Sequence, residues 1–285
     1  MARCNGRYFQ WCRPVRGVVV VAGVVFFAAT VAIPAISAIK LAPHRAIYEV
    51  KLLKASRGGN VADAHGAISI EWQESCHAWN VDQRFRLGLA LDGGHNVETD
   101  ITFSSSEFKD GSRYSFNSKT TRNGRQTGHF QGKVARPSPN TAAIVRYNQP
   151  KRMEVSLPAG TMFPMQHTQA ILNAAARGEP RISAHFFEGP RPEDSPFLAS
   201  TMILGGPNQA QNGVAGDYGN PIDLMWWRIR VALFTGLPDN TEPDFEFAID
   251  LQQDGIARAI TFDYQEFSLT GDLRVVERLP RPDCP

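Results

Sequence analysis

Apolar side chains recur at every second position in many short runs of this chain, and this period constrains the fold more than any other feature. In an extended strand, successive side chains point to opposite faces, so alternation gives one face to a core and one to water. The clearest run has the apolar residues Phe245, Phe247, Ile249 and Leu251. The turn signal Asp254-Gly255 follows it, and a second alternating run extends from Ile260 to Tyr264. Together they predict a β-hairpin.

Similar alternation occurs along most of the chain. The further runs are Tyr48-Val50-Leu52, Ile68-Ile70-Trp72, Trp79-Val81 with Phe85-Leu87, Val97-Thr99-Ile101-Phe103 and Trp227-Ile229-Val231-Leu233. Asn123-Gly124 marks another tight turn, between Tyr114-Phe116 and Phe130. We count about thirteen strands at near-hairpin spacing, which predicts antiparallel pairing and an all-β fold.

Two segments depart from this pattern. Residues 164–176 have a helical period, with Thr168, Ile171, Leu172 and Ala175 on one face. Pro164 suits the first turn and Gly178 the C-terminal end, so we predict one short helix over about residues 164–177. Residues 205–220 are rich in glycine and asparagine and predict a long loop.

The N-terminus has the pattern of an export signal. Its first sixteen residues carry four arginines and no acidic residue: Arg3, Arg7, Arg13 and Arg16. An uncharged, largely apolar run follows from Gly17 to Ile36, and Ser37 and Ala38 are small residues suited to cleavage. We predict a signal peptide over residues 1–38 and one periplasmic domain over residues 39–285. The alternative is an uncleaved membrane anchor, since the run approaches the length that spans a bilayer.

The charge of the predicted mature chain is nearly balanced. Removing residues 1–38 takes away four of the thirty basic residues and none of the twenty-eight acidic ones, which leaves a formal charge of −2. No block of Lys and Arg remains that could follow a phosphate backbone. We therefore predict no nucleic-acid partner, and membrane contact only through the N-terminal signal.

The four cysteines fall into two pairs. Cys4 and Cys12 lie in the signal, so the mature chain keeps only Cys76 and Cys284. Two cysteines in an oxidising compartment most simply form one disulfide. The alternative pairs Cys76 as a nucleophile with His77 as its base. Adjacent strand residues point to opposite faces, however, so these side chains would not meet.

No catalytic or metal-binding motif is apparent. The seven histidines include no pair spaced for zinc, and the chain has neither a Gly-x-Ser-x-Gly elbow nor a phosphate-binding loop. Carboxylates such as Glu246 and Asp250 fall on the solvated face of an alternating strand. We therefore predict no catalytic residue, no metal and no cofactor.

Several stretches together resemble the EipB family, the cell envelope integrity proteins of the alphaproteobacterial periplasm. They are residues 41–48 (LAPHRAIY), residues 157–164 (LPAGTMFP) with His167, and residues 262–271 (FDYQEFSLTG) with Cys284. The resemblance implies one long antiparallel sheet wound into an open, overlapping β-spiral with a short helix. It also implies a Cys76–Cys284 disulfide and a role in resisting envelope stress. The chain departs from the family pattern at Phe187-Glu188-Gly189-Pro190, where Phe-Asp-Gly-Ser is expected.

Three hypotheses for function follow. The first is a non-enzymatic periplasmic protein that maintains envelope integrity by binding a lipid, glycan or protein partner. The residues predicted to line its groove are Phe163, Met165, Ile171, Trp226 and Trp227. The second is a periplasmic hydrolase of envelope polymers, with acids from separate strands. The third is an outer-membrane barrel, which needs strands of about ten residues with aromatic girdles, whereas the alternating runs here are mostly shorter.

Overall fold

The computed structural model describes residues 39–209, 224–235 and 241–284, all within one compact unit that spans residues 36–285. The predicted signal and residues 210–220 of the predicted loop lie outside the described residues. Within the described ranges, no helix has the length and apolar character needed to span a bilayer.

The described residues form fourteen strands and two short helices. The strands are β1 (His44–Ala55), β2 (Val61–Glu74), β3 (Ala78–Leu91), β4 (Asn96–Phe108), β5 (Arg113–Arg122), β6 (Arg125–Ala135), β7 (Ala143–Gln149), β8 (Met153–Leu157), β9 (Arg181–Phe186), β10 (Phe197–Asn208), β11 (Trp226–Phe234), β12 (Phe245–Gln252), β13 (Ala257–Asp263) and β14 (Phe267–Arg278). The helices are α1 (Pro164–Ala176) and a 3-10 turn (Pro192–Asp194).

All fourteen strands belong to a single antiparallel sheet. Their order is β8-β7-β6-β5-β4-β3-β2-β1-β14-β13-β12-β11-β10-β9. The chain builds outward from β1 to β8, passes through α1, and returns from β9 to β14, which pairs with β1. Every other neighbouring pair is consecutive in sequence, which confirms the antiparallel all-β prediction.

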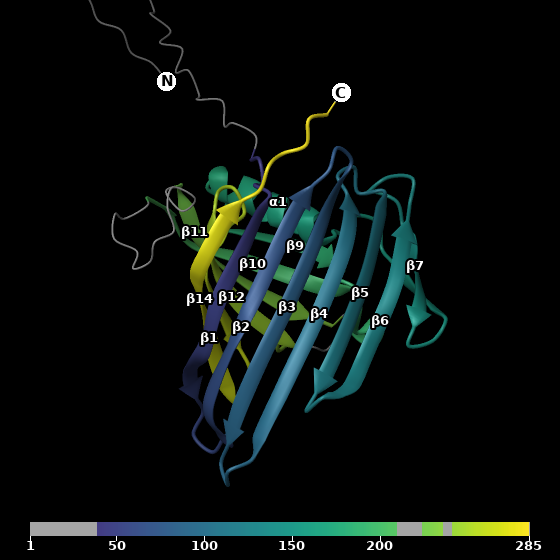
Figure 1. Ribbon diagram of the computed structural model, residues 1–285. Helices are drawn as coiled ribbons and strands as arrows, with labels where there is room; N and C mark the ends of the chain where they lie inside the picture. Colours follow the sequence, from purple (N-terminus) through teal and green to yellow (C-terminus); the bar gives the residue numbers. More distant parts are fainter. Residues whose placement is uncertain (1–38, 210–223, 236–240, 285) are drawn as a thin grey trace, which may run out of the picture. The chain divides into compact units, whose positions relative to one another are not determined.

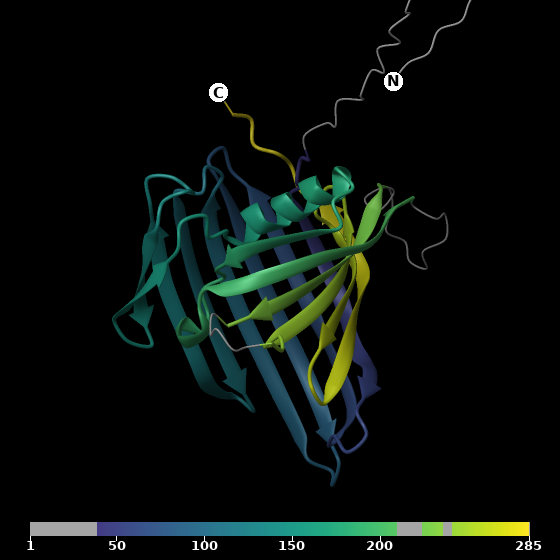
Figure 2. The same cartoon turned by 180° about the vertical axis from the view of Figure 1, so that it is seen from behind.

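The sheet curls so that one end lies over the other. In both views, β9–β12 cross the face of the layer formed by β2–β6, and α1 lies along one rim between the two layers (Figures 1 and 2). This arrangement confirms the open, overlapping sheet with one short helix that the family resemblance implied.

Three clusters of buried side chains hold the layers together. The first core cluster joins Trp79 and Val81 of β3 to α1 and to β10–β12. The second lies among β1–β3, β13 and β14, and the third among β5–β8 with Phe163 and Phe187. Burial of a large apolar side chain contributes about 1.5–3 kcal/mol, so these clusters favour the curled sheet over a flat one.

The predicted hairpin turns are present. Asn123 and Gly124 both have positive φ, 49° and 74°, as a two-residue turn between β5 and β6 requires. Between β12 and β13, the buried Asp254 carboxylate accepts hydrogen bonds from Gln252 Nε2 at 2.9 Å and from the Ile256 N–H at 3.4 Å.

The strands are longer than their alternating runs predicted. β2 and β3 each have 14 residues, because pairing with their neighbours continues through polar and glycine positions where the pattern fades. The prediction of a loop from residue 205 was also wrong for residues 205–208. These residues end β10 and pair irregularly with β11.

The predicted helix is confirmed over Pro164–Ala176. It has proline in its first turn, and it ends where Gly178 adopts a φ of 73° and donates its N–H to Ala175 O at 3.0 Å. Leu172 and Ala174 are fully buried, so the helix covers one rim of the core.

The C-terminal segment is fastened to the start of the sheet. Cys76 and Cys284 form the predicted disulfide, with their Cα atoms 5.6 Å apart. Arg281 binds both Glu74 and the Leu41 carbonyl at 2.6 Å, and the Leu279 N–H donates to Pro43 O at 2.9 Å. The C-terminus is thus tied to the β2–β3 turn and to the residues that precede β1.

Candidate functional site

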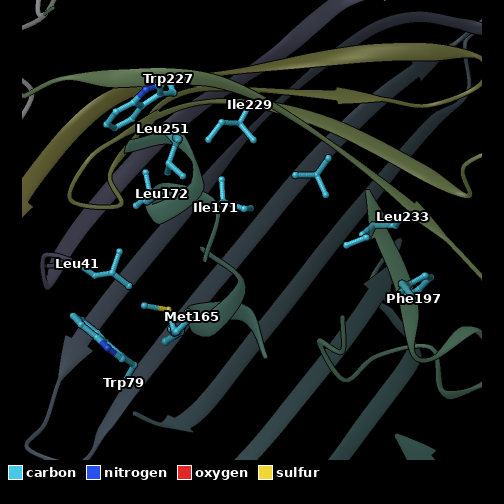
Figure 3. Close-up of a cluster of buried hydrophobic side chains, with 14 residues drawn as sticks. Leu41, Trp79, Met165, Ile171, Leu172, Phe197, Trp227, Ile229, Leu233 and Leu251 are labelled. Carbon is cyan, nitrogen blue, oxygen red and sulfur yellow. The ribbon is translucent and has the colours of Figure 1, made fainter. Parts of the chain in front are cut away.

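Three of the five residues predicted to line a ligand groove lie together in the core. Met165, Ile171 and Trp227 are 3–5% exposed and belong to the first core cluster. Figure 3 shows Met165 near Trp79, and Leu251 between Trp227 and Leu172 of α1. These side chains attach α1 to the sheet, and their contact with a ligand stays a prediction.

The other two predicted groove residues lie elsewhere. Phe163 is fully buried in the third core cluster, between the Tyr114 ring at 4.8 Å and the Arg136 guanidinium at 4.4 Å. Trp226 points away from Trp227, as alternation requires, and its ring lies 5.3 Å from the Arg258 guanidinium. The five residues therefore do not line one common surface.

A buried carboxylate holds the start of α1. Glu107, near the end of β4, is 2% exposed, and its two oxygens accept the Met165 and Gln166 N–H groups at 2.8 Å. Phe163 precedes the helix and has no side-chain oxygen, so Glu107 takes the place of a capping residue. Gln166 completes the cap through a long, 3.5 Å contact from the Phe163 N–H.

Burial dominates the acidity of Glu107. Desolvation raises its pKa from 4.5 to about 7, although the two N–H groups and the nearby Arg136 oppose the shift. Arg136 is itself held by the Gly111 carbonyl at 2.8 Å. This site docks a helix, because both carboxylate oxygens of Glu107 accept N–H groups of its first turn.

A second titratable group lies buried on the same helix. His167 is 5% exposed, its Nε2 has no hydrogen-bond partner in the described structure, and its ring lies 4.9 Å from that of Phe186. Burial lowers its pKa from 6.5 to about 4, so it is neutral near pH 7. The described residues bring no three His, Cys, Asp or Glu side chains together that could hold a metal ion.

An aromatic surface on the inner side of the sheet is the best candidate for ligand binding. It consists of six phenylalanines, which we call the inner aromatic face: Phe85, Phe103, Phe130, Phe245, Phe247 and Phe262. Each packs against one of the three core clusters yet is only partly buried.

Both layers contribute to this face. Phe103 and Phe130 flank Ser118 across β4, β5 and β6, while Phe245 and Phe247 lie on β12. The layers meet where Phe85 of β3 approaches Phe262 of β13, with ring centroids 6.1 Å apart. The alternating pattern predicted that these phenylalanines lie on apolar strand faces. It could not show which of them stay partly exposed once the sheet curls.

Comparison with known proteins gives a consistent result. The sequence profile of a family described as EipB-like matches residues 35–280. Over 245 residues the chain is 26% identical to the cell envelope integrity protein EipB of Brucella abortus (strain 2308), covering 84% of this chain and 85% of that protein. A beta-barrel-like protein of a domain of unknown function, also from Brucella abortus, has a crystal structure similar to this one. The TM-score is 0.75 at 24% identity, over 85% of this chain and 100% of the other.

Proposed function

Because this chain belongs to the EipB-like family, we propose that it maintains cell envelope integrity from the periplasm by binding an envelope lipid, without catalysis. The lipid's acyl chains would lie on the inner aromatic face. The family's role supports the envelope function. The partial exposure of the inner aromatic face supports the binding of a lipid.

The partial exposure of the six rings is the observation that carries the lipid assignment. Full burial of a phenylalanine side chain contributes about 1.5–3 kcal/mol, and a fold that leaves such rings partly exposed forgoes some of that stabilisation. A bound apolar molecule would recover it. Pockets for apolar ligands are lined mainly by hydrophobic and aromatic side chains, as this face is.

The position of the face favours an acyl chain over the other partners considered. The rings face inward between two layers of one sheet, and packed layers are only about 10 Å apart. An opening along this face would be too narrow for a folded protein, whereas a slender hydrocarbon chain would need only a small displacement of the partly exposed rings. The side chains that separate the rings on β5 are the hydroxyl residues Ser118 and Thr120, which offer little for the many hydroxyls of a glycan.

Lipid extraction and probe binding test this proposal. We expect mature protein purified from the periplasm to carry a stoichiometric lipid, detectable by mass spectrometry after extraction, and to bind a fluorescent fatty acid. The double variant Phe103→Asn/Phe130→Asn should lose the probe. Ile144→Asn is the matched control, because Ile144 is 42% exposed on β7, where it points away from the buried Val145.

The opposite results would overturn the lipid assignment. In the first, the purified protein carries no lipid and binds no probe. In the second, the double variant folds and binds the probe as the wild type does. If the double variant fails to fold, Phe130→Trp provides a second test, since a larger ring should displace the probe with less loss of packing. Among the described residues, no observation favours the hydrolase alternative. Glu107 and Asp254, the two buried acids, are engaged in structural contacts.

A further inference from the structure

The outer side of β2–β5 is hollowed, although outward-facing sheet surfaces are usually filled by their side chains. Two open hollows of about 480 Å³ and 510 Å³ lie there. Arg84 lines the first hollow and Arg86 the second, and both bind the Asp100 carboxylate, at 2.6 Å and 3.2 Å. Because these three residues lie at the shared border, we treat the two hollows as one outer trough.

The trough runs along β3. Its outward positions on that strand are Asp82, Arg84, Arg86 and Gly88, which span roughly 20 Å at the usual rise per residue. The buried residues Val81 and Leu87 point the other way, toward the core. Most of the trough lining therefore lies on the side of the sheet opposite the inner aromatic face, and Phe103 is the one residue of that face that also borders the first hollow.

The charges of the trough compensate each other. Its lining has three arginines and four carboxylates: Arg45, Arg84, Arg86, Glu71, Asp82, Glu98 and Asp100. Arg84 donates to Asp100 through two nitrogens, at 2.6 Å and 3.0 Å, and Arg45 donates to Glu71 at 2.7 Å. Polyphosphates and nucleic acids bind surfaces with an excess of positive charge, which this lining lacks.

Hydrogen-bonding groups make up much of the remaining lining. Ser69, Thr102, Ser104 and Asn117 line the first hollow, and Thr121 lines the second. Hydroxyl and amide groups both donate and accept hydrogen bonds, and the arginines and carboxylates supply stronger donors and acceptors. The large apolar residues of the lining are Ile47, which is 40% exposed, Ile70 and Phe103, which are partly buried, and Leu87, which is buried, so the trough lacks the exposed aromatic core of a typical protein interface.

One flat ring lies on the floor of the second hollow. His65 of β2 is opposite Gly88 of β3, and a Cβ atom at Gly88 would lie 3.1 Å from both Cε1 and Nε2 of His65. The absence of a side chain at Gly88 thus allows the imidazole to lie across the neighbouring strand. Its apolar ring face is presented beside the polar groups of Arg86 and Asp100.

We propose that the outer trough binds a linear, uncharged carbohydrate chain. A sugar has hydroxyls around its edge and C–H groups on its faces. The hydroxyls at the edge of the sugar can form hydrogen bonds with the arginines, carboxylates and hydroxyls of the trough. The C–H groups on one face of the sugar can pack against the His65 ring. The elongated form of the trough suits several consecutive sugars. This glycan site is additional to the lipid site proposed above and does not depend on it.

Calorimetric titration of the mature protein tests the proposal, with chitotetraose and maltotetraose as probes. We expect at least one probe to bind, and the preferred probe would indicate a cell-wall-type glycan or an α-glucan as the source. Arg84→Ala should weaken binding roughly tenfold or more, because it removes charge-assisted hydrogen bonds. Gly88→Ala should also weaken binding, since the added methyl group displaces the His65 ring.

A matched control and a second variant keep the test decisive. Arg146→Ala removes another exposed arginine, which pairs with Glu154 on the β7–β8 hairpin outside the trough, and should leave binding unchanged. Should Arg84→Ala fail to fold, Thr102→Leu blocks the trough from an exposed position. Three results would each overturn the assignment. The protein binds neither probe, the folded variants Gly88→Ala and Thr102→Leu bind as tightly as the wild type, or heparin binds more tightly than either probe. Fatty-acid binding should be unaffected by all of these variants.

Discussion

Replacing Glu107 by Gln should change how the stability of the protein depends on pH. Burial raises the pKa of this carboxyl from 4.5 to about 7. The folded protein therefore retains a proton between these values that the unfolded chain has lost. The contribution of Glu107 to the unfolding free energy is fully present below pH 4.5 and is lost as the pH rises through 7. At about 1.4 kcal/mol per pKa unit, the change is about 3 kcal/mol.

His167 acts in the opposite direction on the same helix. Its pKa is lowered from 6.5 to about 4, so its contribution is present above pH 6.5 and is lost as the pH falls toward 4. The two effects are similar in size and nearly cancel in the wild type. Glu107→Gln removes one of them. Relative to wild type, the variant should lose about 3 kcal/mol of stability between about pH 8 and about pH 4.5.

Urea denaturation of the oxidised protein across this pH range measures the effect. The quantity to compare is the difference in unfolding free energy between variant and wild type, because all other titrating groups cancel in it. Glu266→Gln, at an exposed position in the β13–β14 turn, is the control for the chemical change itself, and the Glu107→Gln result is compared with it at each pH. A Glu107→Gln difference that stays constant across this pH range would show that burial does not perturb the Glu107 carboxyl.

Three further predictions concern processing, the disulfide and physiology. Intact mass of protein from the periplasm should begin near Ala38 or Ile39, and recovery of the full chain in the inner membrane would instead support an uncleaved anchor. Cys284→Ser should lower the melting temperature and protease resistance, since a bridge spanning 208 residues contributes up to roughly 5 kcal/mol; two reactive thiols in denatured, unreduced wild type would contradict this. Depletion should sensitise cells to deoxycholate and β-lactams, and undiminished survival on both would contradict the envelope role.

Much of the fold could be predicted from the sequence because its main signals are local. Alternation identified strands such as β12 and β13, and Pro164 with Gly178 bounded α1 correctly. The two-residue period shows which side chains share a face, but not what covers that face. Periodicity therefore could not show that Trp227 shares a buried cluster with residues of α1, or that the Arg136 guanidinium lies over the Phe163 ring, and the contact of either residue with a ligand stays a prediction.

The candidate sites depend on contacts between distant residues, which periodicity cannot reveal. Glu107 has the sequence context of an ordinary strand end, and it becomes buried only because the start of α1 docks on it. His65 and Gly88 become neighbours only through the register of β2 with β3. The overlap of the two layers was likewise implied by the family resemblance, and no residue pattern predicted it.

The pairing of β1 with β14 has a consequence for the order in which the molecule can form. One edge of β1 pairs with β2, which follows it directly in the sequence. The other edge pairs with β14 (Phe267–Arg278), which lies at the far end of the chain. A protein threaded across a membrane from its N-terminus would therefore emerge with its central strand half-paired. That open edge of β1 persists until β14 has emerged, so a chaperone that shields the edge would matter most before synthesis or transfer of the chain is complete.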